Sequence, residues 1–270
     1  MKIRMLFDGY LICSDCDGTL TDREGKLSEE NARAIRYFQE RGGRFTLATG
    51  RFVNHLNQYR QQLQVNAEVV ALNGTMLYDL VHKRESASWK MRREGCLEVL
   101  RYIQEAALEV QECWVNCGLE HGYEFRPGSD DLDAFAASMP EEWYKIVFVQ
   151  KEEVTPLLRA DLRNRFGHSY RFDSSWPNGL EMQRADSGKG IAVERLKASY
   201  EGKVHTVICV GDAENDLSMI EAADIGYAVA NAAEEVKRAA DRVTVSNEEH
   251  AIAHIIYELE QEIKERAEKK

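Results

Sequence analysis

The sequence predicts an α/β protein whose core is a Rossmann-like, doubly wound parallel sheet, with an α+β domain inserted into it. Short apolar runs near both ends of the chain alternate with helix-like segments, as in a parallel sheet covered by helices. Polar segments containing glycine follow several of those runs, and ligands bind at that edge of such sheets. The middle of the chain instead shows alternating strand patterns with short turns, which is typical of an antiparallel sheet.

The first part of the expected core spans residues 1–83. A short apolar run leads directly into Asp15, and we expect it to be a buried strand. The following helix has Ser28 as a plausible N-cap and two glycines after its end. We expect strands at 11–13, 45–48 and 69–72 and a helix over 28–41.

The second part of the core spans residues 187–270. Residues 246–249 resemble a capping box that opens a final helix. Apolar residues at 252, 255, 256, 259 and 263 have helical spacing. We expect strands at 206–210, 225–229 and 243–245.

The middle segment, residues 84–186, is the expected inserted domain. Its strands are joined by short turns, so we expect an antiparallel sheet with helices packed on one face. Helix-like stretches cover 94–108 and 154–166, and alternating stretches cover 112–115, 122–125, 144–149, 169–172 and 180–183.

The composition limits the kinds of partner. The 270 residues permit one large domain or two small ones, and 44% hydrophobic with 30% charged residues suits a packed core. The net charge of −11 argues against nucleic acid or an anionic membrane as a partner. If the substrate is itself an anion, a metal ion and basic side chains must supply local positive charge. A monomer or a weak homo-oligomer is expected.

The sequence favours a cytoplasmic protein with reduced thiols. It has no run of about 18 apolar residues, so no membrane span is expected. Residues 1–11 lack the apolar core and cleavage pattern of a signal peptide, and the six cysteines show no disulfide framework. Cys13 and Cys16 have the spacing of a redox or metal pair. Positions i and i+3 of a strand face opposite sides, however, which disfavours that function.

The strongest chemical signal is Asp15-Cys16-Asp17-Gly18-Thr19, at the end of the first strand. Two carboxylates two positions apart can converge on one point, with one acting as a nucleophile and the other moving a proton. Spacing alone is weak evidence, because residues 131 and 133 are also aspartates and belong to the first turn of an expected helix. The apolar strand before Asp15 and the Gly-Thr after Asp17 distinguish this pair of aspartates from the pair at 131 and 133.

A second acidic segment, residues 211–216, also follows an apolar strand. Mg²⁺ prefers oxygen ligands, and Asp15 and Asp212 at adjacent strand ends could supply two carboxylates. Asp216 could add a third or orient a bound water. The alternative is a helix N-terminus enriched in acidic residues, which is common. The first motif favours the metal site over that alternative.

Two further segments could bind an anion. Thr49-Gly50-Arg51 offers a hydroxyl and backbone N–H groups at a strand end, although taken alone it is an ordinary cap. Lys189 lies between two glycines at the start of a helix and could reach an anion, although a surface lysine is the simpler interpretation. The segment around Lys189 lacks the spacing of a P-loop.

These four segments, in this order, resemble the motifs of the haloacid dehalogenase superfamily of phosphotransferases. The large insertion after the second motif is similar to the cap of the Cof-type branch, which includes many sugar-phosphate phosphatases. Asn73-Gly74, before the insertion, also fits that branch. One departure is Cys16, where the family usually has Leu, Ile or Met. The resemblance implies a phosphatase acting on a small phosphorylated metabolite, with a sugar phosphate as the expected substrate. It also implies a cap that covers the site and selects the leaving group.

The resemblance also implies a role for each site residue. Asp15 would attack phosphorus and form an aspartyl-phosphate, and Asp17 would protonate the leaving alcohol and then activate water. Mg²⁺ would be held by the Asp15 carboxylate, the Asp17 main-chain carbonyl and Asp212, with Asp216 beside them. Thr49 and Lys189 are also expected to act in catalysis. The expected set of phosphate-binding residues is Cys16, Thr49, Gly50, Arg51, Lys189 and Asn215.

Two other functions stay open at this point. A phosphomutase would return the phosphoryl group to a sugar rather than to water, and a binding protein would keep the fold without turnover. The intact carboxylates and lysine argue against the second. The substrate is not identified by the sequence. Candidate cap contacts are Tyr123, Arg126, Trp143 and Arg184, each of which is more often a packing or surface residue.

Overall fold

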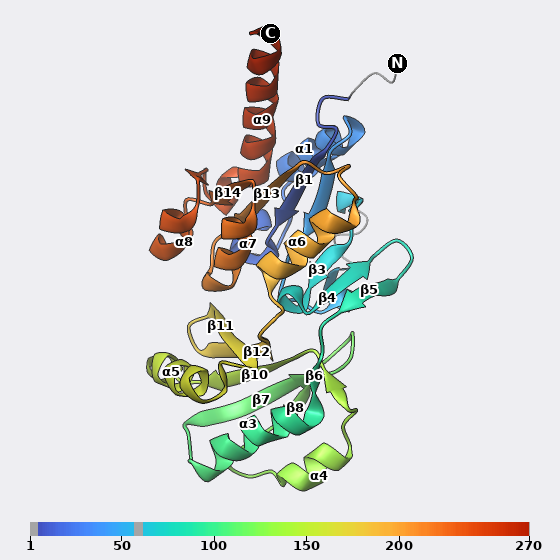
Figure 1. Cartoon of the computed structure of the whole chain (residues 1–270). Coiled ribbons are helices and arrows are strands. Elements are labelled where there is room, and N and C mark those ends of the chain that lie inside the picture. Colours follow the sequence, from blue (N-terminus) through green and yellow to red (C-terminus); the bar gives the residue numbers. More distant parts are fainter. Residues whose placement is uncertain (1–4, 57–61, 270) are drawn as a thin grey trace.

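The structure is a computed structural model, and it describes residues 5–56 and 62–269. Figure 1 shows two units, with the first and last parts of the chain together in one and the middle of the chain in the other. In the part of the chain that is described, no helix is long and apolar enough to cross a membrane.

The core unit is built on a five-stranded parallel sheet in the order β15-β14-β13-β1-β2. Strand β1 lies between β13 and β2, and its Ile12 lies opposite Ile208 on β13 and Phe45 on β2. The chain therefore leaves β1 in one direction and returns on its other side, which makes β1 a topological switch point. The strands are β1 (Tyr10–Ser14), β2 (Arg44–Leu47), β13 (Thr206–Gly211), β14 (Ile225–Ala228) and β15 (Arg242–Val243).

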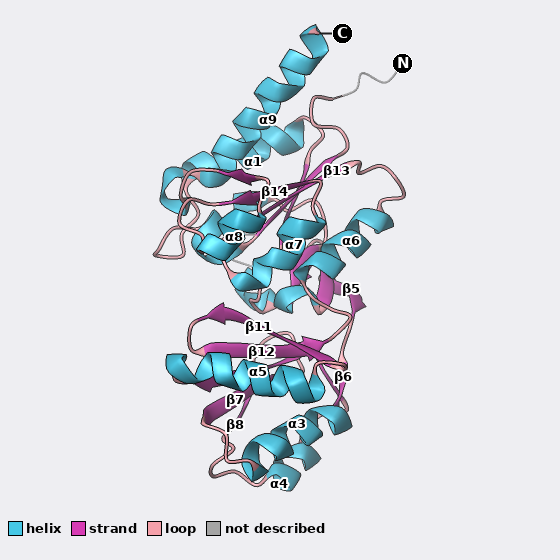
Figure 2. Ribbon diagram, turned by 60° about the vertical axis from the view of Figure 1, so that its left-hand side comes forward, coloured by secondary structure: helices cyan, strands magenta, loops and turns pink. Residues whose placement is uncertain are grey.

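Helices cover both faces of this sheet, as Figures 1 and 2 show. On one face, α1 (Glu29–Glu40) and α9 (Ala251–Glu268) bury Ile35 and Ile255 in a cluster with alternate strand residues. On the other face, α6 (Lys189–Ser199) buries its apolar residues against the remaining ones. α7 (Leu217–Ala222) and α8 (Glu234–Ala239) follow β13 and β14. The doubly wound arrangement confirms the predicted core fold.

Two predicted helix starts differ in outcome. The side chain of Ser28 accepts a hydrogen bond from the N–H of Asn31, which confirms it as the N-cap of α1. The capping box at residues 246–249 is also present, but it closes a separate short turn. His250 then takes a left-handed conformation with φ 63°, and α9 begins only at Ala251. The Asn31 side chain accepts the N–H of Ala253 and so fixes the start of α9 against α1.

A small antiparallel sheet, which was not predicted, lies across one of the expected domain boundaries. It consists of β3 (Val69–Ala71), β4 (Met76–Asp79) and β5 (Arg84–Ser88), and it joins the core sheet through a parallel bridge between Ala48 and Val70. Because β5 pairs with β4, the expected boundary between residues 83 and 84 divides a hairpin. We propose that the inserted domain begins at about residue 89 instead, and we keep its expected end at residue 186.

The inserted unit contains the predicted antiparallel sheet, in the order β11-β12-β10-β7-β8. Its strands are β7 (Val110–Asn116), β8 (Tyr123–Phe125), β10 (Lys145–Gln150), β11 (Tyr170–Trp176) and β12 (Gly179–Arg184), with the short pair β6 (Met91–Arg92) and β9 (Glu142–Trp143) beside it. Three helices, α3 (Arg93–Glu105), α4 (Leu132–Ala137) and α5 (Thr155–Phe166), supply side chains to its apolar core. The helices therefore pack on one face of the sheet, as predicted.

The two faces of the inserted sheet have different surroundings. Cys113, Ile146 and Phe148 are buried in the apolar cluster beneath the helices. Side chains alternate along a strand, so the intervening residues point toward the core unit. Figure 2 shows this sheet between its helices and the core.

Short helical turns connect several of these elements. They are η1 (Cys16–Leu20), η2 (Val53–Leu56), η3 (Leu72–Gly74), η4 (Glu152–Val154), η5 (Glu214–Asp216) and η6 (Asn247–Glu249). Three of them directly follow β1, β3 and β13 at the carboxyl edge of the core.

Candidate active site

A cavity of about 570 Å³ lies at the carboxyl edge of the core sheet, where the inserted sheet covers it. Its size suits one small molecule. The core contributes Asp15, Asp17, Thr49, Gly50, Arg51, Phe52, Asp212, Ala213 and Asn215. The inserted unit contributes Trp114, Asn116, Gly122, Lys145, Val147, Val149, Ser175, Trp176 and Glu181.

Asp15 and Asp17 both line this cavity, but not because they share a face of a strand. β1 ends at Ser14, and the N–H of Asp15 still bonds to the carbonyl of Val210 at 2.9 Å. Asp17 lies inside the turn η1, where Gly18 takes φ 76°. The two carboxylates therefore converge through a tight turn rather than through strand alternation.

Gly18 is required by its conformation and by its neighbour. Its φ lies in the left-handed region that favours glycine. A Cβ atom at this position would lie 2.6 Å from Oδ2 of Asp212, closer than real side chains approach. The hydroxyl of Thr19 donates to the other oxygen, Oδ1, of Asp212 at 2.7 Å. The residues after Asp17 thus place the Asp212 carboxylate against the turn.

A buried lysine joins two of the three acidic residues at the site. Nζ of Lys189 donates to Oδ1 of Asp15 at 2.6 Å and to Oδ1 of Asp216 at 2.5 Å. Lys189 is almost fully buried. Carboxylate oxygens of Asp15, Asp212 and Asp216 all lie within 4.8 Å of one another. One ammonium group thus faces three carboxylates, which leaves an excess of negative charge in a buried place.

Burial and the neighbouring charges shift the pKa values of Asp15, Asp212 and Lys189. Burial raises the pKa of Asp15 well above its ordinary value; Lys189 opposes the rise, and the neighbouring carboxylates add to it. Burial and Asp216 raise the pKa of Asp212 to about 6. Burial alone would lower the pKa of Lys189, but Asp15 and Asp216 outweigh it and raise that pKa. The lysine therefore stays charged, and the raised pKa values of Asp15 and Asp212 favour protons or a further cation beside them.

The three carboxylates could bind a metal ion, and their donor chemistry fits a hard divalent cation. All the donors are oxygens, which Mg²⁺ prefers. Asp216 is the least free of the three: its Oδ1 bonds to Lys189, and its Oδ2 accepts the N–H groups of Asp212 and Ala213. Asp15 and Asp212 are thus the better direct ligands, and Asp216 fixes the loop that carries Asp212.

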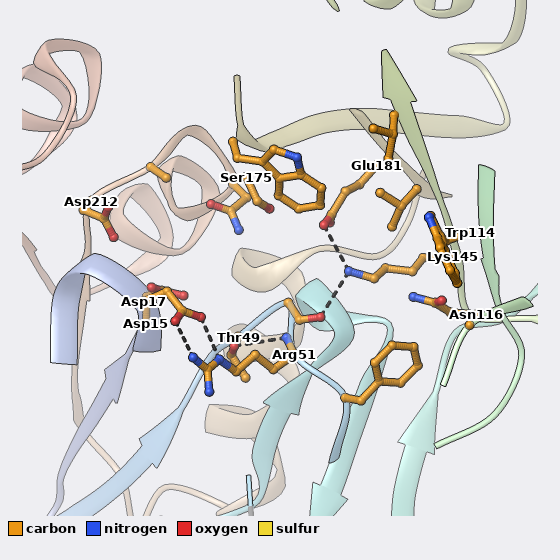
Figure 3. Close-up of a pocket in the computed structure, with 18 residues that line it drawn as sticks. Asp15, Asp17, Thr49, Arg51, Trp114, Asn116, Lys145, Ser175, Glu181 and Asp212 are labelled. Atoms are coloured by element: carbon orange, nitrogen blue, oxygen red, sulfur yellow. Dashed lines mark hydrogen bonds and ion pairs between the residues drawn. The ribbon is translucent and has the colours of Figure 1, made fainter. Parts of the chain in front are cut away.

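The segment after β2 supplies a hydroxyl and a guanidinium group. The N–H of Thr49 bonds to the carbonyl of Val70 at 2.8 Å, and its hydroxyl accepts the N–H of Arg51 at 3.1 Å. The Arg51 side chain pairs with both oxygens of Asp17, at 2.8 and 2.5 Å, as Figure 3 shows. Arg51 therefore orients the Asp17 carboxylate at the mouth of the cavity.

A buried polar network connects the two units, and sequence reasoning did not find it. Nζ of Lys145 donates to the carbonyl of Gly50 and to Oε1 of Glu181, both at 3.1 Å. The other oxygen of Glu181 accepts the side-chain amide of Asn73. Asn73 in turn accepts the amide of Asn215 at 3.1 Å. Figure 3 shows the Lys145 side chain extending toward Glu181. The network holds the inserted sheet against two segments of the core site.

A family model of haloacid dehalogenase-like hydrolases matches residues 12–256 of the chain. The chain belongs to this haloacid dehalogenase-like hydrolase family. The match includes both parts of the core and the inserted unit, which is the cap of a Cof-type phosphatase. The predicted resemblance is therefore confirmed, and so is the prediction that the protein is a phosphatase.

Curated relatives and solved structures agree with this assignment. The phosphatase is 24% identical over 266 residues to 5-amino-6-(5-phospho-D-ribitylamino)uracil phosphatase YitU of Bacillus subtilis, across 92% of this chain and 97% of that one. It is 26% identical over 267 residues to pyridoxal phosphate phosphatase YbhA of Escherichia coli, with the same coverage. The solved structure of the subclass IIB sugar phosphatase BT4131 has a TM-score of 0.75 at 16% identity, covering 92% and 98% of the chains, and shows the same fold.

The phosphatase places most of the predicted site residues on the cavity wall, and three lie behind it. The seven on the wall are Asp15, Asp17, Thr49, Gly50, Arg51, Asp212 and Asn215. Lys189 and Asp216 lie beneath the wall, where they hold Asp15 and the Asp212 loop. The Cys16 side chain is buried in the core cluster, and burial raises the pKa of its thiol. Cys16 is fully buried and does not line the described cavity.

The candidate cap contacts from the sequence lie elsewhere. Trp143 is fully buried in the apolar core of the cap. Arg126 pairs with Glu124, and Arg184 pairs with Asp186. Tyr123 is exposed, and none of the four lines the described cavity. Most of the cap residues that do line the cavity lie on the strand faces opposite the cap core. The alternation of residues along each strand was the only feature of the sequence that could have indicated them.

Proposed function

We propose that this phosphatase hydrolyses a phosphate monoester of a small metabolite through a phosphoryl intermediate on Asp15, with Mg²⁺ as its cofactor. The observation that carries the proposal is the buried Asp15 carboxylate, which lines the cavity while Lys189 holds one of its oxygens at 2.6 Å. Phosphoryl transfer requires positioning and neutralisation of charge above all, and this site supplies both.

In the first step, Oδ2 of Asp15 would form a bond to phosphorus while the bond to the leaving alcohol oxygen breaks. Lys189 holds Oδ1 and so orients the attacking carboxylate. Asp17 would give a proton to the leaving oxygen, and Arg51 would position the Asp17 carboxylate for that transfer. The Thr49 hydroxyl and the Asn215 amide would bind the phosphoryl oxygens, since both residues come from the same edge of the sheet.

In the second step, Asp17 would take a proton from water as the water oxygen attacks phosphorus. The bond to Oδ2 of Asp15 breaks, inorganic phosphate leaves and the Asp15 carboxylate is regenerated. Asp15, Asp212 and the main-chain carbonyl of Asp17 would hold Mg²⁺, with Asp216 supporting Asp212. The bound ion would supply positive charge to the phosphoryl oxygens and to the crowded carboxylates.

Product analysis tests hydrolysis against its alternatives. With Mg²⁺ and a panel of phosphate monoesters, we expect inorganic phosphate to accumulate in proportion to substrate loss, and a chelator to stop it. Conversion of a sugar phosphate to its isomer without free phosphate would indicate a phosphomutase. Absence of turnover on every ester and on acetyl phosphate would indicate a binding protein and contradict the proposal.

Mg²⁺ should raise the thermal unfolding midpoint more at about pH 8 than at about pH 5. The unfolded chain has ordinary carboxyl pKa values, whereas the pKa of folded Asp212 is raised to about 6 and that of Asp15 is also raised. Between about pH 4 and pH 6 the folded protein therefore holds more protons, so its metal-free stability falls as the pH rises. Above that range Asp15 and Asp212 would hold Mg²⁺ in place of those protons, and the ion would supply the positive charge that the protons supplied.

Unfolding scans at both pH values, with and without Mg²⁺, measure this difference. Asp212→Asn should lose the Mg²⁺ effect. Asp186→Asn should keep it, because Asp186 is an exposed acid that pairs with Arg184 outside the three carboxylates. An equal Mg²⁺ effect at the two pH values, or its retention in Asp212→Asn, would contradict the metal assignment.

The proposal includes the wider setting of the enzyme. The inserted unit would act as the cap that selects the leaving group, because it supplies half of the cavity wall. A cytoplasmic location is part of the proposal, since all six cysteines are free. Sugar phosphates were the expected substrates. The solved structure of BT4131 is that of a sugar phosphatase, whereas the substrates named for the relatives YitU and YbhA carry a uracil and a pyridoxal ring.

A further inference from the structure

The cap half of the cavity has an apolar floor between two tryptophans. Trp114 on β7 lies opposite Val147 on β10, and Val149 on β10 lies opposite Gly179 on β12. Gly179 in turn lies opposite Trp176 on β11. Because these residues are register partners on one sheet face, they form a continuous apolar surface toward the core.

Both tryptophans keep more than a third of their surface exposed. Trp114 is 36% exposed and Trp176 is 39% exposed, whereas Trp143 of the same domain is fully buried. A Cβ atom at Gly179 would lie 2.1 Å from the Trp176 indole, so the ring rests directly on the glycine backbone. Large aromatic side chains held open on a cavity wall indicate an apolar ligand surface.

Most polar groups on the cap side of the cavity already have partners. Lys145 and Glu181 bond to each other, and both also bond to the core. The hydroxyl of Ser175 accepts the amide of Asn73 at 3.3 Å. A leaving group with many hydroxyls would therefore find few free donors or acceptors, and each unpaired hydroxyl would reduce its affinity.

Asn116, in this half of the cavity, has a side-chain oxygen without a hydrogen-bond partner among the described residues. Asn116 lines the cavity beside Lys145, its register partner, and is 2% exposed. That oxygen is buried, so in the present orientation the amide offers its N–H group to a ligand, and a half-turn about the Cβ–Cγ bond would instead offer the oxygen as an acceptor. Figure 3 shows Asn116 and Trp114 on the same side of the cavity.

We propose that the cap selects phosphate esters whose alcohol carries a flat heteroaromatic ring, which lies on the Trp114–Val147–Val149–Trp176 surface and bonds to Asn116 through a polar ring edge. The inference rests on the proposed phosphatase activity and names the substrate class for it. Flat rings gain from contact with indole faces and need few hydrogen bonds, which matches the groups present. Hydroxyl-rich sugar phosphates match them poorly.

A substrate comparison with purified full-length enzyme and Mg²⁺ tests this inference. The probes are pyridoxal 5′-phosphate, benzyl phosphate, glucose 6-phosphate and acetyl phosphate, and phosphate release is measured for each. We expect kcat/KM for pyridoxal 5′-phosphate to exceed that for glucose 6-phosphate by about 100-fold. Equal or faster turnover of glucose 6-phosphate would overturn the inference.

Acetyl phosphate separates the two possible failures, because its small acyl group does not reach the tryptophans. Absence of phosphate release from all four compounds means that the proposed activity is wrong. Release from acetyl phosphate without preference for a flat ring means that only the substrate class is wrong.

Variants of the cap surface supply the second arm. Trp114→Leu and Trp176→Leu should each lower the ratio of kcat/KM for pyridoxal 5′-phosphate to that for acetyl phosphate by about tenfold, and the Phe variants should keep most of it. Asn116→Leu should lower the ratio for pyridoxal 5′-phosphate over benzyl phosphate by about tenfold. Tyr257→Leu is the matched control, since Tyr257 is an exposed aromatic residue on α9 that does not line the cavity.

The variants can also contradict the inference. An unchanged ratio in both Trp→Leu variants would show that the indoles do not contact the leaving group. The Phe variants are the control for misfolding, because they retain an aromatic ring. If a correctly folded Phe variant lowered the ratio of kcat/KM for pyridoxal 5′-phosphate to that for acetyl phosphate as much as the Leu variant does, ring contact would also be contradicted.

Discussion

Asp15→Asn should reduce phosphate release by about 10⁴-fold or more, because the amide cannot form the bond to phosphorus. The substitution keeps the shape of the side chain. It also removes one of three neighbouring carboxylates. The charge that it removes is an unfavourable one, because burial and the other carboxylates raise the pKa of Asp15. We therefore expect the thermal stability of metal-free Asp15→Asn to equal or exceed that of the wild type. Steady-state phosphate release and thermal unfolding measure the two effects.

Asp131→Asn is the matched control for this variant. Asp131 begins an acidic pair with the same spacing, but it is the N-cap of α4 and accepts the N–H of Ala134 at 2.9 Å. Asn is also a good N-cap, so this variant should keep normal activity. Substantial phosphatase activity in Asp15→Asn, from a preparation free of wild-type enzyme, would contradict a nucleophilic role for Asp15.

Lys189→Met should have the second largest effect, reducing turnover by about 10³-fold. The lysine is the one side chain that donates to both Asp15 and Asp216 in the described structure, and methionine fills a similar volume without a charge. Loss of the ammonium group leaves buried carboxylates without compensation. Breaking a buried pair in this way costs about 3 to 5 kcal/mol of stability.

Mg²⁺ provides a readout that separates a lost charge from general damage at Lys189. A divalent ion at the three carboxylates would replace part of the missing positive charge. We therefore expect Mg²⁺ to raise the unfolding midpoint of Lys189→Met by more than it raises that of the wild type. Lys197→Met, on the exposed side of the same helix where Lys197 pairs with Asp224, should change neither property. Full activity in Lys189→Met would contradict the account of the site.

The core of the site was predictable because its residues follow strands. An apolar run ending in Asp15, another ending before Thr49 and a third ending before Asp212 imply one edge of a parallel sheet. The structure brings all three residues to one cavity. The detailed geometry was less predictable: Asp17 converges with Asp15 through the turn at Gly18, which strand alternation does not describe.

The cap surface could not be predicted because alternation identifies two faces without saying which one meets the core. Trp114 and Val147 alternate with Cys113 and Ile146, and only the fold shows that the second pair lies beneath the helices. The selected candidates included Trp143, whose large aromatic ring suggested a ligand contact but is buried in the cap core. Residue type alone selected the wrong candidate, because the sheet face on which a residue lies determines whether it can contact the ligand.

The junction between the units was missed for a different reason. Lys145 and Glu181 lie 36 residues apart on neighbouring strands of the cap and read as ordinary charged residues. Their burial and their contacts with Gly50 and Asn73 depend on the docking of the cap against the core. Strand β5 was missed because its sequence, Arg-Glu-Ser-Ala-Ser, is polar and mostly exposed. Local pattern carries no signal for either feature.

The central claim is that the phosphoryl group passes through Asp15, and rapid acid quenching during turnover tests it most directly. Enzyme mixed with acetyl phosphate and Mg²⁺, quenched and digested, should yield one peptide that carries a single added phosphoryl group at Asp15. The modification should disappear on treatment with hydroxylamine, as expected of an acyl phosphate. Asp17→Asn should slow hydrolysis of the intermediate and so make the adduct easier to trap. Phosphate release from this variant without any trapped adduct would contradict the claim, and so would an adduct on another residue.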